Sequence, residues 1–188
     1  MRRDLGAKAY LYPQPVLIIS SYDEDGNIDV MNAAWGGMSD YKKISMCIDR
    51  GHRTTANILK SRAMTIAMAD SEHVVQCDYV GIVSANKEPR KAEKSGFTFT
   101  RSEKVNAPII NELPFTFECN LISYDNESEI MVCEIVNISA DERILDMDGK
   151  IDLSVFHPIT FDAANNAYVE LGRKVGNAFK DGTALIKQ

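Results

Sequence analysis

Two short apolar runs joined by a glycine-containing turn constrain the fold of this chain more than any other feature. Residues Val16–Ser21 form a continuous run of mainly branched aliphatic side chains, which is typical of a strand buried on both faces. The segment Asp23–Asn27 then supplies the residue types of a tight turn, and Ile28–Ala34 returns as a second strand. The sequence therefore predicts an antiparallel β-hairpin near its start.

Further strands and two helices are expected along the rest of the chain. Many strands at short spacing, with one helix early and one mid-chain, favour a closed antiparallel barrel with helices packed outside it. No internal repeat, low-complexity tract or linker interrupts the sequence, so we expect a single domain over residues 1–188. The expected strands are Ile44–Asp49, Ala63–Ala69, Phe97–Thr100, Phe115–Tyr124, Ile130–Ala140, Phe156–Phe161 and Tyr168–Leu171, and the expected helices are Thr54–Ser61 and a second one beginning near Ser71.

Composition narrows the class of protein. The chain has 188 residues, of which 45% are hydrophobic and 26% charged, which suits a soluble globular domain with one substantial core. Its formal net charge of -6 argues against general attraction to nucleic acid or to acidic membranes. The longest apolar run, Val16–Ile19, is far too short to span a membrane, and Met1–Gly6 lacks the pattern of a signal peptide. We therefore expect a cytoplasmic protein.

The cysteines and histidines do not suggest a metal site. Four cysteines stand far apart without a C-x-x-C pair, and their apolar neighbours predict buried free thiols. The three histidines form no close ligand pairs either. The cysteines are Cys47, Cys77, Cys119 and Cys133, and the histidines are His52, His73 and His157.

The stretch from Met31 to Asn57 carries the features of a binding site for a flat, anionic ligand. Asn32 offers a directional hydrogen-bonding partner. The small residues Ala33, Ala34, Gly36 and Gly37 allow the backbone to approach a planar ring, although small residues in strands more often mark close packing between elements. Both interpretations stay open on the sequence alone.

A helix start within this stretch suggests an anion site. Arg53, Thr54 and Thr55 precede the apolar residues of the expected helix, and Thr54 is predicted to be its N-cap. Free N–H groups and the helix dipole favour a phosphate, to which a guanidinium and two hydroxyls add hydrogen bonds. The alternative is an ordinary capped helix end at the surface.

Other motifs are weaker. The glycine pair at 36–37 lacks the G-x-G-x-x-G spacing of a Rossmann site, no P-loop ending is present, and the G-x-x-x-G at 172–176 is better explained by turns. The basic residues Lys87, Arg90, Lys91 and Lys94 are spaced for one exposed, solvated face. No nucleophile, base and orienting group occur together, so hydrolysis is not supported.

These segments together resemble a known family. The strand Val16–Ser21, the sequence Asn-Ala-Ala-Trp at 32–35 and His-Arg-Thr-Thr-Ala-Asn at 52–57 are similar in type, order and spacing to the flavoredoxin-type branch of the flavin reductase-like, FMN-binding split-barrel proteins. The resemblance continues through Asp-Tyr-Val-Gly at 78–81, Ser84 and Lys87 to the strand that carries Tyr168, and it covers roughly residues 13–171. The segment at 40–43 departs from the pattern, because relatives often carry proline there.

The resemblance implies a fold, a cofactor and a set of binding residues. It implies a mainly β, six-stranded antiparallel Greek-key split barrel with flanking helices, in which FMN lies at the interface of a homodimer. Tyr168 would approach the flavin from the neighbouring subunit, and no catalytic side chain is assigned. The implied FMN-binding residues are Met31, Asn32, Ala33, Ala34, Trp35, His52, Arg53, Thr54, Thr55, Asn57, Tyr79, Val80, Gly81, Ser84, Lys87 and Tyr168.

The resemblance also implies a function. We expect an FMN-dependent oxidoreductase that passes electrons from a reduced nicotinamide nucleotide, NADH or NADPH, or from a redox protein, to a flavin or another acceptor. The isoalloxazine ring carries such chemistry itself and requires the protein mainly to bind and orient it. Two alternatives stay open: a non-enzymatic FMN carrier for electron transfer or flavin storage, and a split-barrel protein that no longer binds FMN.

Overall fold

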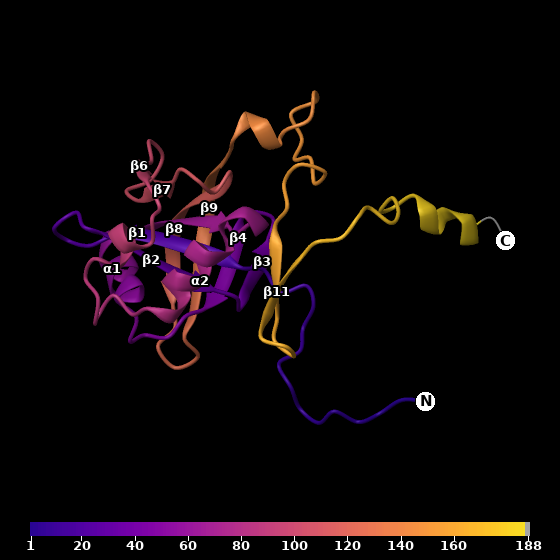
Figure 1. Ribbon diagram of the computed structural model, residues 1–188, viewed down its shortest axis with the longest axis horizontal. Helices are drawn as coiled ribbons and strands as arrows, with labels where there is room; N and C mark the ends of the chain where they lie inside the picture. The colour runs from indigo at the N-terminus through magenta and orange to yellow at the C-terminus, as the bar shows by residue number, and fades with distance from the viewer. Residues whose placement is uncertain (187–188) are drawn as a thin grey trace.

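The computed structural model describes residues 1–186. It consists of a curled antiparallel sheet with helices around it, and of two terminal arms that extend away from the same side of this body (Figure 1). The strands dominate the described chain, which confirms the predicted mainly β, antiparallel class.

The main sheet contains seven strands in the order β2-β1-β5-β8-β9-β4-β3, and every neighbouring pair is antiparallel. The edge strands β2 and β3 follow each other directly in the chain, with only residues 34 and 35 between them. The curled sheet is therefore split between β2 and β3, which the chain links without pairing them. The strands are β1 Leu17–Tyr22, β2 Ile28–Ala33, β3 Gly36–Asp40, β4 Lys43–Cys47, β5 Ala63–Met68, β8 Phe115–Tyr124 and β9 Ile130–Ala140.

The sheet includes one edge strand, β3, that was not among the strands expected from the sequence. Its sequence, Gly-Gly-Met-Ser-Asp, lacks β-branched residues, and pairing with β4 creates the strand. A Cβ atom on Gly36 would lie 2.7 Å from Met46 Cγ and 3.0 Å from Leu17 Cδ1. Close packing of β3 therefore accounts for the small residue at position 36.

Strand β1 is buried on both faces, as predicted, because its alternate side chains enter two cores. Leu17 and Ile19 point into the interior of the curled sheet, where they meet Met46 and Ile66. Ile18 points to the opposite core, under the helices that flank the sheet. The β1–β2 hairpin is thereby held rigidly between two apolar layers.

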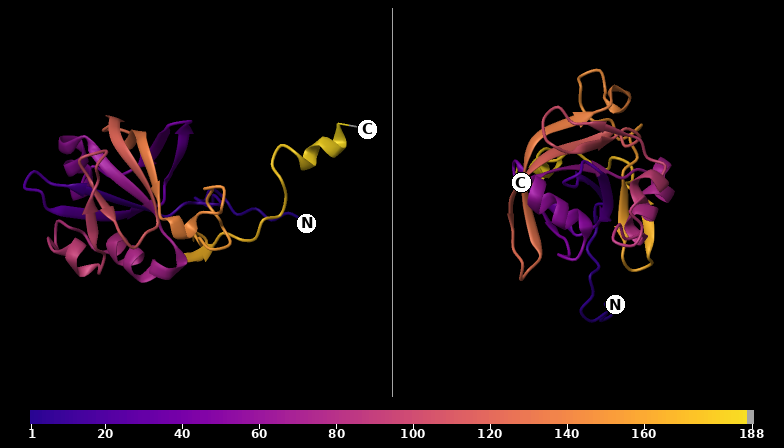
Figure 2. Two further views of the ribbon diagram at one scale, coloured as in Figure 1. Left: turned by 90° about the horizontal axis from the view of Figure 1, so that it is seen from above. Right: turned by 90° about the vertical axis from the view of Figure 1, so that its left-hand side faces the viewer.

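The helices cover the sheet around β1 and β2. Helix α1 (Arg53–Ser61) lies across one end of the curled sheet, and α2 (Val74–Ile82) and the short α3 (Lys91–Lys94) pack against β2 (Figure 2). Two small antiparallel sheets complete the body, β6 (Phe99–Arg101) with β7 (Pro108–Ile110) and β10 (Ile159–Asp162) with β11 (Ala167–Glu170). The 3₁₀ helices are Ser71–His73, Glu142–Ile144 and Asp181–Leu185.

Two local predictions were wrong. Helix α1 begins at Arg53 with His52 as its N-cap, so Thr54 is the second residue of the helix and does not cap it. Cys47 is exposed, whereas the other three cysteines are buried, and all four are free thiols. Cys47 ends strand β4, in which Ile44 and Met46 face the core and Cys47 faces the other way.

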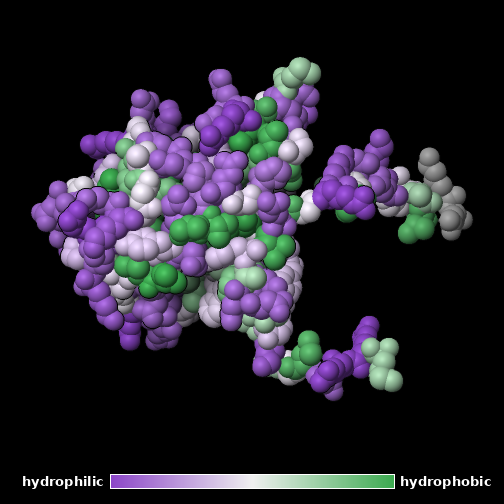
Figure 3. Space-filling view, viewed as in Figure 1, coloured by the Kyte–Doolittle hydropathy of each residue, from purple (hydrophilic) through white to green (hydrophobic). Residues whose placement is uncertain are grey.

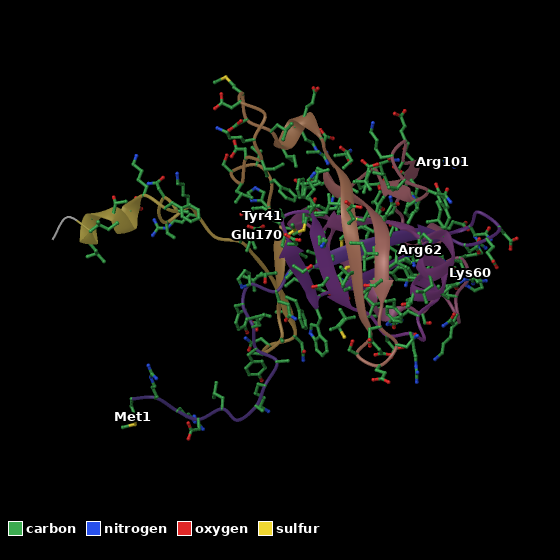
Figure 4. All side chains as sticks on the ribbon, turned by 180° about the vertical axis from the view of Figure 1, so that it is seen from behind. Met1, Tyr41, Lys60, Arg62, Arg101 and Glu170 are labelled. Atoms are coloured by element: carbon green, nitrogen blue, oxygen red, sulfur yellow. The ribbon has the colours of Figure 1, made fainter. Side chains whose placement is uncertain are left out.

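The two arms are exposed throughout. Residues 1–13 and 171–186 are exposed, and both arms carry large apolar side chains, among them Leu5, Leu11, Val175 and Phe179. Figure 3 shows apolar and polar residues alternating along these arms, and Figure 4 places Met1 far from the body and Lys60 at the opposite end of it. No described helix is both long and apolar enough to cross a bilayer.

Candidate functional site

A cavity of about 220 Å³ opens between strand β2, the start of α1 and the end of α2; we call it the β2–α1 pocket. It brings together residues that lie more than fifty positions apart in the sequence. Eight of the predicted site residues line it: Met31, Asn32, His52, Arg53, Thr54, Val80, Gly81 and Ser84. Asp29 and Lys91 line it as well, although neither was predicted.

The start of α1 presents backbone N–H groups to this pocket. His52 has an extended backbone and its side chain caps nothing. The first N–H that bonds back into the helix belongs to Ala56, which donates to the His52 carbonyl. The N–H groups of residues 53–55 therefore have no capping side chain, and a helix start in this state favours an anion.

The hydroxyls of the two threonines serve the protein itself. Thr54 Oγ1 donates to Asp29 Oδ2 at 2.5 Å, and Thr55 Oγ1 donates to the Asp49 carbonyl at 2.8 Å. Asn57 is buried and its Nδ2 lies 3.5 Å from Ser21 Oγ. Any contribution of Thr54 and Thr55 to a bound anion thus comes from their N–H groups.

Arg53 lies at the mouth of the pocket and also forms an ion pair with the carboxylate of Asp23. Its guanidinium lies 3.3 Å from Asp23 Oδ2, and about a third of its side chain is exposed. Partial desolvation disfavours the charged form of Asp23. Hydrogen bonds from Asn27 and Asp25, together with Arg53, outweigh it and lower the pKa of the Asp23 carboxyl. Arg53 is therefore partly neutralised before any ligand arrives.

Lys91 is the residue that the sequence interpretation missed. It was predicted on an exposed basic face, but it is only 4% exposed and lines the pocket. Within residues 1–186 its ammonium group has no hydrogen-bond partner and forms no ion pair with a carboxylate at 4.0 Å or less. Burial lowers the pKa of Lys91, and the charge of Asp29 opposes that effect. Lys91 is thus a mostly buried lysine that lines the pocket and whose ammonium nitrogen is not one of the fully buried, unpartnered atoms, which suits contact with an anionic ligand.

Asp29 completes this group of buried charges. It is 4% exposed; its Oδ2 accepts from Thr54, while its Oδ1 has no hydrogen-bond partner in the described chain. Asp29 Oδ1 therefore adds an unpaired negative charge to the pocket, and this charge interacts with the positive charge of Lys91. The pocket thus contains buried residues of both charges.

Asn32 and Gly81 form the wall between β2 and α2. Asn32 Nδ2 donates to the Cys77 carbonyl at 3.0 Å, and a Cβ atom on Gly81 would lie 3.1 Å from Asn32 Cβ. Gly81 therefore allows α2 to approach β2 closely. Behind this wall, burial raises the pKa of Cys77 to about 12, so Cys77 is a neutral thiol.

Comparison with known proteins agrees with this arrangement. The model of the family described as "Flavin reductase like domain" matches residues 9–157 of the chain, which is most of its length. The chain belongs to the flavin reductase-like family. This membership supports a flavin as the molecule that the protein handles.

Solved structures of similar proteins support the same family. Flavoredoxin of Desulfovibrio vulgaris (Miyazaki F) is 30% identical, with a TM-score of 0.92 over 97% of this chain and 100% of that one. Flavoredoxin from Methanosarcina acetivorans is 24% identical, with a TM-score of 0.87 over 98% and 99% of the two chains. The FMN-binding domain of a flavin reductases-like enzyme from Shewanella baltica OS155 is 18% identical, with a TM-score of 0.79 over 87% and 89%. The fold is a flavin reductase-like split barrel, as expected from the sequence.

The remaining predicted residues of this flavin reductase-like protein lie outside the β2–α1 pocket. Lys87 is exposed, Tyr79 packs on the core under the helices, and Ala33 is half-buried against the core inside the curled sheet. Ala34 and Trp35 line a different cavity, next to the N-terminal arm. The structure thus divides the predicted stretch 31–35 between two pockets.

Tyr168 has a partner in its own chain. Its hydroxyl donates to Asp78 Oδ1 of α2 at 2.9 Å, and its ring lies 6.1 Å from that of Phe161. Burial first, and then the hydrogen bond to Asp78, raises the pKa of Tyr168 to about 12, while Asn32 opposes the shift. Tyr168 therefore supports α2 and the region of Asn32 from behind, which is the role of a core tyrosine.

Proposed function

We propose that this protein binds FMN in the β2–α1 pocket and works as an FMN-dependent oxidoreductase. It would take electrons from a reduced nicotinamide nucleotide or a redox protein and pass them to a flavin or another acceptor. The single observation that carries the proposal is Lys91, a buried lysine without a partner beside the uncapped start of α1. The printed name of the Shewanella baltica relative, an FMN-binding domain, agrees with this cofactor.

The residues of the pocket suit the phosphate of FMN. Lys91 would supply a buried positive charge, the N–H groups of residues 53–55 would donate hydrogen bonds, and Arg53 would add charge from the mouth. Ser84 lies on the opposite rim, where Asn86 Nδ2 donates to the Gly51 carbonyl at 3.0 Å and ties the two rims together. Lys87 is the weakest of the proposed contacts because it is exposed and outside the pocket.

The flavin ring would supply the redox chemistry, and this chain would bind and orient it. Met31 and Asn32 on β2, together with Val80 and Gly81 on α2, would border the cofactor beyond its phosphate. The close contact of Gly81 with Asn32 fixes the width of this wall. The hydroxyl–carboxylate pair of the pocket, Thr54 and Asp29, is buried, which suits chemistry carried by the cofactor more than by these side chains.

The protein would act as a homodimer. The β2–α1 pocket measures about 220 Å³, below the roughly 300–1,000 Å³ of ordinary ligand pockets, so a second copy would complete the enclosure of FMN. Both arms expose apolar side chains, and the Desulfovibrio vulgaris structure superposes over 97% of this chain, a range that includes most of the arms. A second copy is the simplest partner for such surfaces.

The decisive experiment measures FMN binding, reduction of the bound flavin and the oligomeric state of the protein. FMN is titrated into the purified full chain while flavin fluorescence is recorded, and the loaded protein is then mixed with NADH or NADPH. We expect saturable binding, bleaching of the flavin by a nicotinamide nucleotide, and a dimer in analytical ultracentrifugation that FMN strengthens. A chain that takes up no FMN overturns the proposal, while a loaded chain bleached only by a partner protein identifies a carrier.

A further inference from the structure

A hydrogen bond between two surface loops closes one end of the β2–α1 pocket. Asn86 Nδ2 donates to the Gly51 carbonyl at 3.0 Å, and we call this contact the Asn86–Gly51 clasp. Gly51 immediately precedes His52, and Asn86 immediately follows Ala85; both of these neighbours line the pocket. The clasp therefore joins the loop that leads into α1 to the loop that follows α2, directly beside the cavity.

The loop on the α1 side holds Gly51 in place. The Gly51 N–H donates to Asp49 Oδ1 at 2.6 Å, and the His52 N–H donates to the Asp49 carbonyl at 3.2 Å. A Cβ atom on Gly51 would lie 2.9 Å from Asp49 Oδ1, so a larger residue would press against this turn. The Gly51 carbonyl is thus a fixed acceptor, two residues before the start of α1.

The loop on the α2 side holds Asn86. The N–H groups of Lys87 and Glu88 both donate to the Ser84 carbonyl at 3.0 Å. The Asn86 N–H lies 3.3 Å from Ser84 Oγ, to which it donates. The Glu88 carbonyl accepts from the Lys91 N–H at 3.1 Å, which connects this loop to the buried Lys91. Both loops are therefore ordered by their own hydrogen bonds, and the side chain of Asn86 bridges them.

The clasp lies at the end of the pocket that we assign to the phosphate. The uncapped N–H groups of residues 53–55 begin two positions after Gly51, and Lys91 lines the same cavity. The phosphate monoester of FMN ends the ligand at this point, whereas the diphosphate of FAD continues outward to an adenosine. The cavity measures about 220 Å³, below the range of ordinary ligand pockets, so a second phosphate and an adenosine would have to lie outside it.

We propose that the Asn86–Gly51 clasp closes the phosphate end of the pocket and makes the site select FMN over FAD, with Asn86 as the specificity-determining residue. This inference rests on the proposed function, because it takes the flavin phosphate to lie at the start of α1. FAD binds only when the clasp opens, and the hydrogen bond that is then lost weakens its binding. The exposed Lys87 next to Asn86 is positively charged, so the selection comes from closure and not from repulsion of the second phosphate.

Isothermal titration calorimetry of the purified full chain with FMN, FAD and riboflavin measures this selection. We expect FMN to bind about fivefold to tenfold more tightly than FAD, the effect of one net hydrogen bond. Because closure is not electrostatic, the ratio of the two affinities should change little between low and high salt. Equal affinities for FMN and FAD, or tighter binding of FAD, would overturn the proposal.

Matched variants assign the selection to one side chain. Asn86→Ala opens the clasp and leaves every residue that lines the pocket in place. The preference for FMN should then disappear, because FAD binds more tightly, while riboflavin affinity stays the same, since riboflavin has no phosphate to enclose. Asn106→Ala removes an exposed amide between β6 and β7 and should keep the preference. The ligands compared on the unaltered chain test the proposal even if Asn86→Ala folds poorly.

The outcomes separate this inference from the proposed function. A chain that binds neither FMN nor FAD would overturn the function, and the clasp with it. A chain that binds FMN but keeps its full preference in Asn86→Ala would overturn the clasp alone. A preference that disappears because FMN binds more weakly, with FAD affinity unchanged, would also overturn the clasp, since Asn86 would then contact the phosphate itself.

Discussion

The β2–α1 pocket and the cavity next to the N-terminal arm both border the stretch of chain at residues 31–36 but are built in opposite ways. The first is small and contains buried charges, Lys91 and Asp29, held by strands and helices of the body. The second is larger, mainly apolar, and bounded on one side by an exposed arm. The difference indicates that the first pocket is suited to a charged group and the second to an apolar one.

Substitution of Lys91 should have the largest effect on the charged pocket. Lys91→Met removes the buried charge, and FMN affinity should fall by about 1.5–3 kcal/mol, roughly 10- to 150-fold. The unfolding free energy should stay equal or rise, because burial disfavours the charged form of Lys91 in the folded chain. Flavin fluorescence titration and urea unfolding measure the two effects.

The matched control for Lys91 is Lys87→Met, which removes an exposed lysine outside the pocket. It should change FMN affinity far less; equal losses in the two variants would show that charge acts only at long range. Since burial lowers the pKa of Lys91, FMN binding to the unaltered chain should also weaken as pH rises through that lowered value. Lys91→Met should lack this part of the pH dependence.

Thr54→Val should separate stability from binding in the same pocket. It deletes the donor to the buried Asp29 Oδ2 and leaves that carboxylate without a hydrogen-bond partner among residues 1–186, so the unfolding free energy should fall by about 1–2 kcal/mol. The N–H of residue 54 remains, and FMN affinity should therefore change little. Thr55→Val, which loses a bond to a neutral carbonyl, is the control and should cost less stability. A large loss of affinity in Thr54→Val alone would mean that the hydroxyl turns to the ligand.

Arg53→Ala should have a smaller effect on binding than Lys91→Met. Arg53 is partly exposed and already paired with Asp23, so its loss should weaken FMN binding by about 1–1.5 kcal/mol. Riboflavin, which lacks the phosphate, should bind equally well to Arg53→Ala and to the unaltered chain. A drop in riboflavin affinity would contradict the assignment of Arg53 to the phosphate end.

The sequence predicted the strands and the start of α1 because their signals are local. Apolar alternation predicts strands, the segment 23–27 predicts a turn, and Arg-Thr-Thr predicts a helix start. Each of these patterns lies within a few residues. Lys91 could not be predicted in this way, since its spacing matches an exposed face and only the packing of α3 against β2 buries it. Strand β3 was missed for the same reason: Gly36–Asp40 has little intrinsic β preference and is formed by its neighbour.

Half of the predicted site residues line one pocket, but the structure gives several of these side chains contacts other than the predicted ones. Thr54 lies in the pocket, but its hydroxyl serves Asp29, and Gly36 is small because Met46 and Leu17 fill the space beside it. Residue types determine which hydrogen bonds and contacts are possible. Which of them form depends on the three-dimensional packing. Cys47 illustrates a signal that was present: in the alternation of β4 it stands opposite to Ile44 and Met46.

Substitution of Tyr168 tests the side chains that lie behind the β2–α1 pocket. It should have the smallest effect on stability. The pKa of Tyr168 is raised to about 12, whereas an unfolded tyrosine titrates near 10, so between these values only the unfolded chain loses the proton. Stability contributed by Tyr168 is complete below about pH 10 and is lost as pH rises toward about 12. Tyr168→Phe should therefore lose stability less steeply over that window, by about 1 kcal/mol after solvent screening. Urea unfolding at pH values on either side of 10 measures the slope, with the exposed Tyr41→Phe as control. If Tyr168→Phe keeps its FMN affinity at neutral pH, the residue only supports α2 through Asp78; if affinity falls with stability intact, Tyr168 belongs to the cofactor site, as the family resemblance implies.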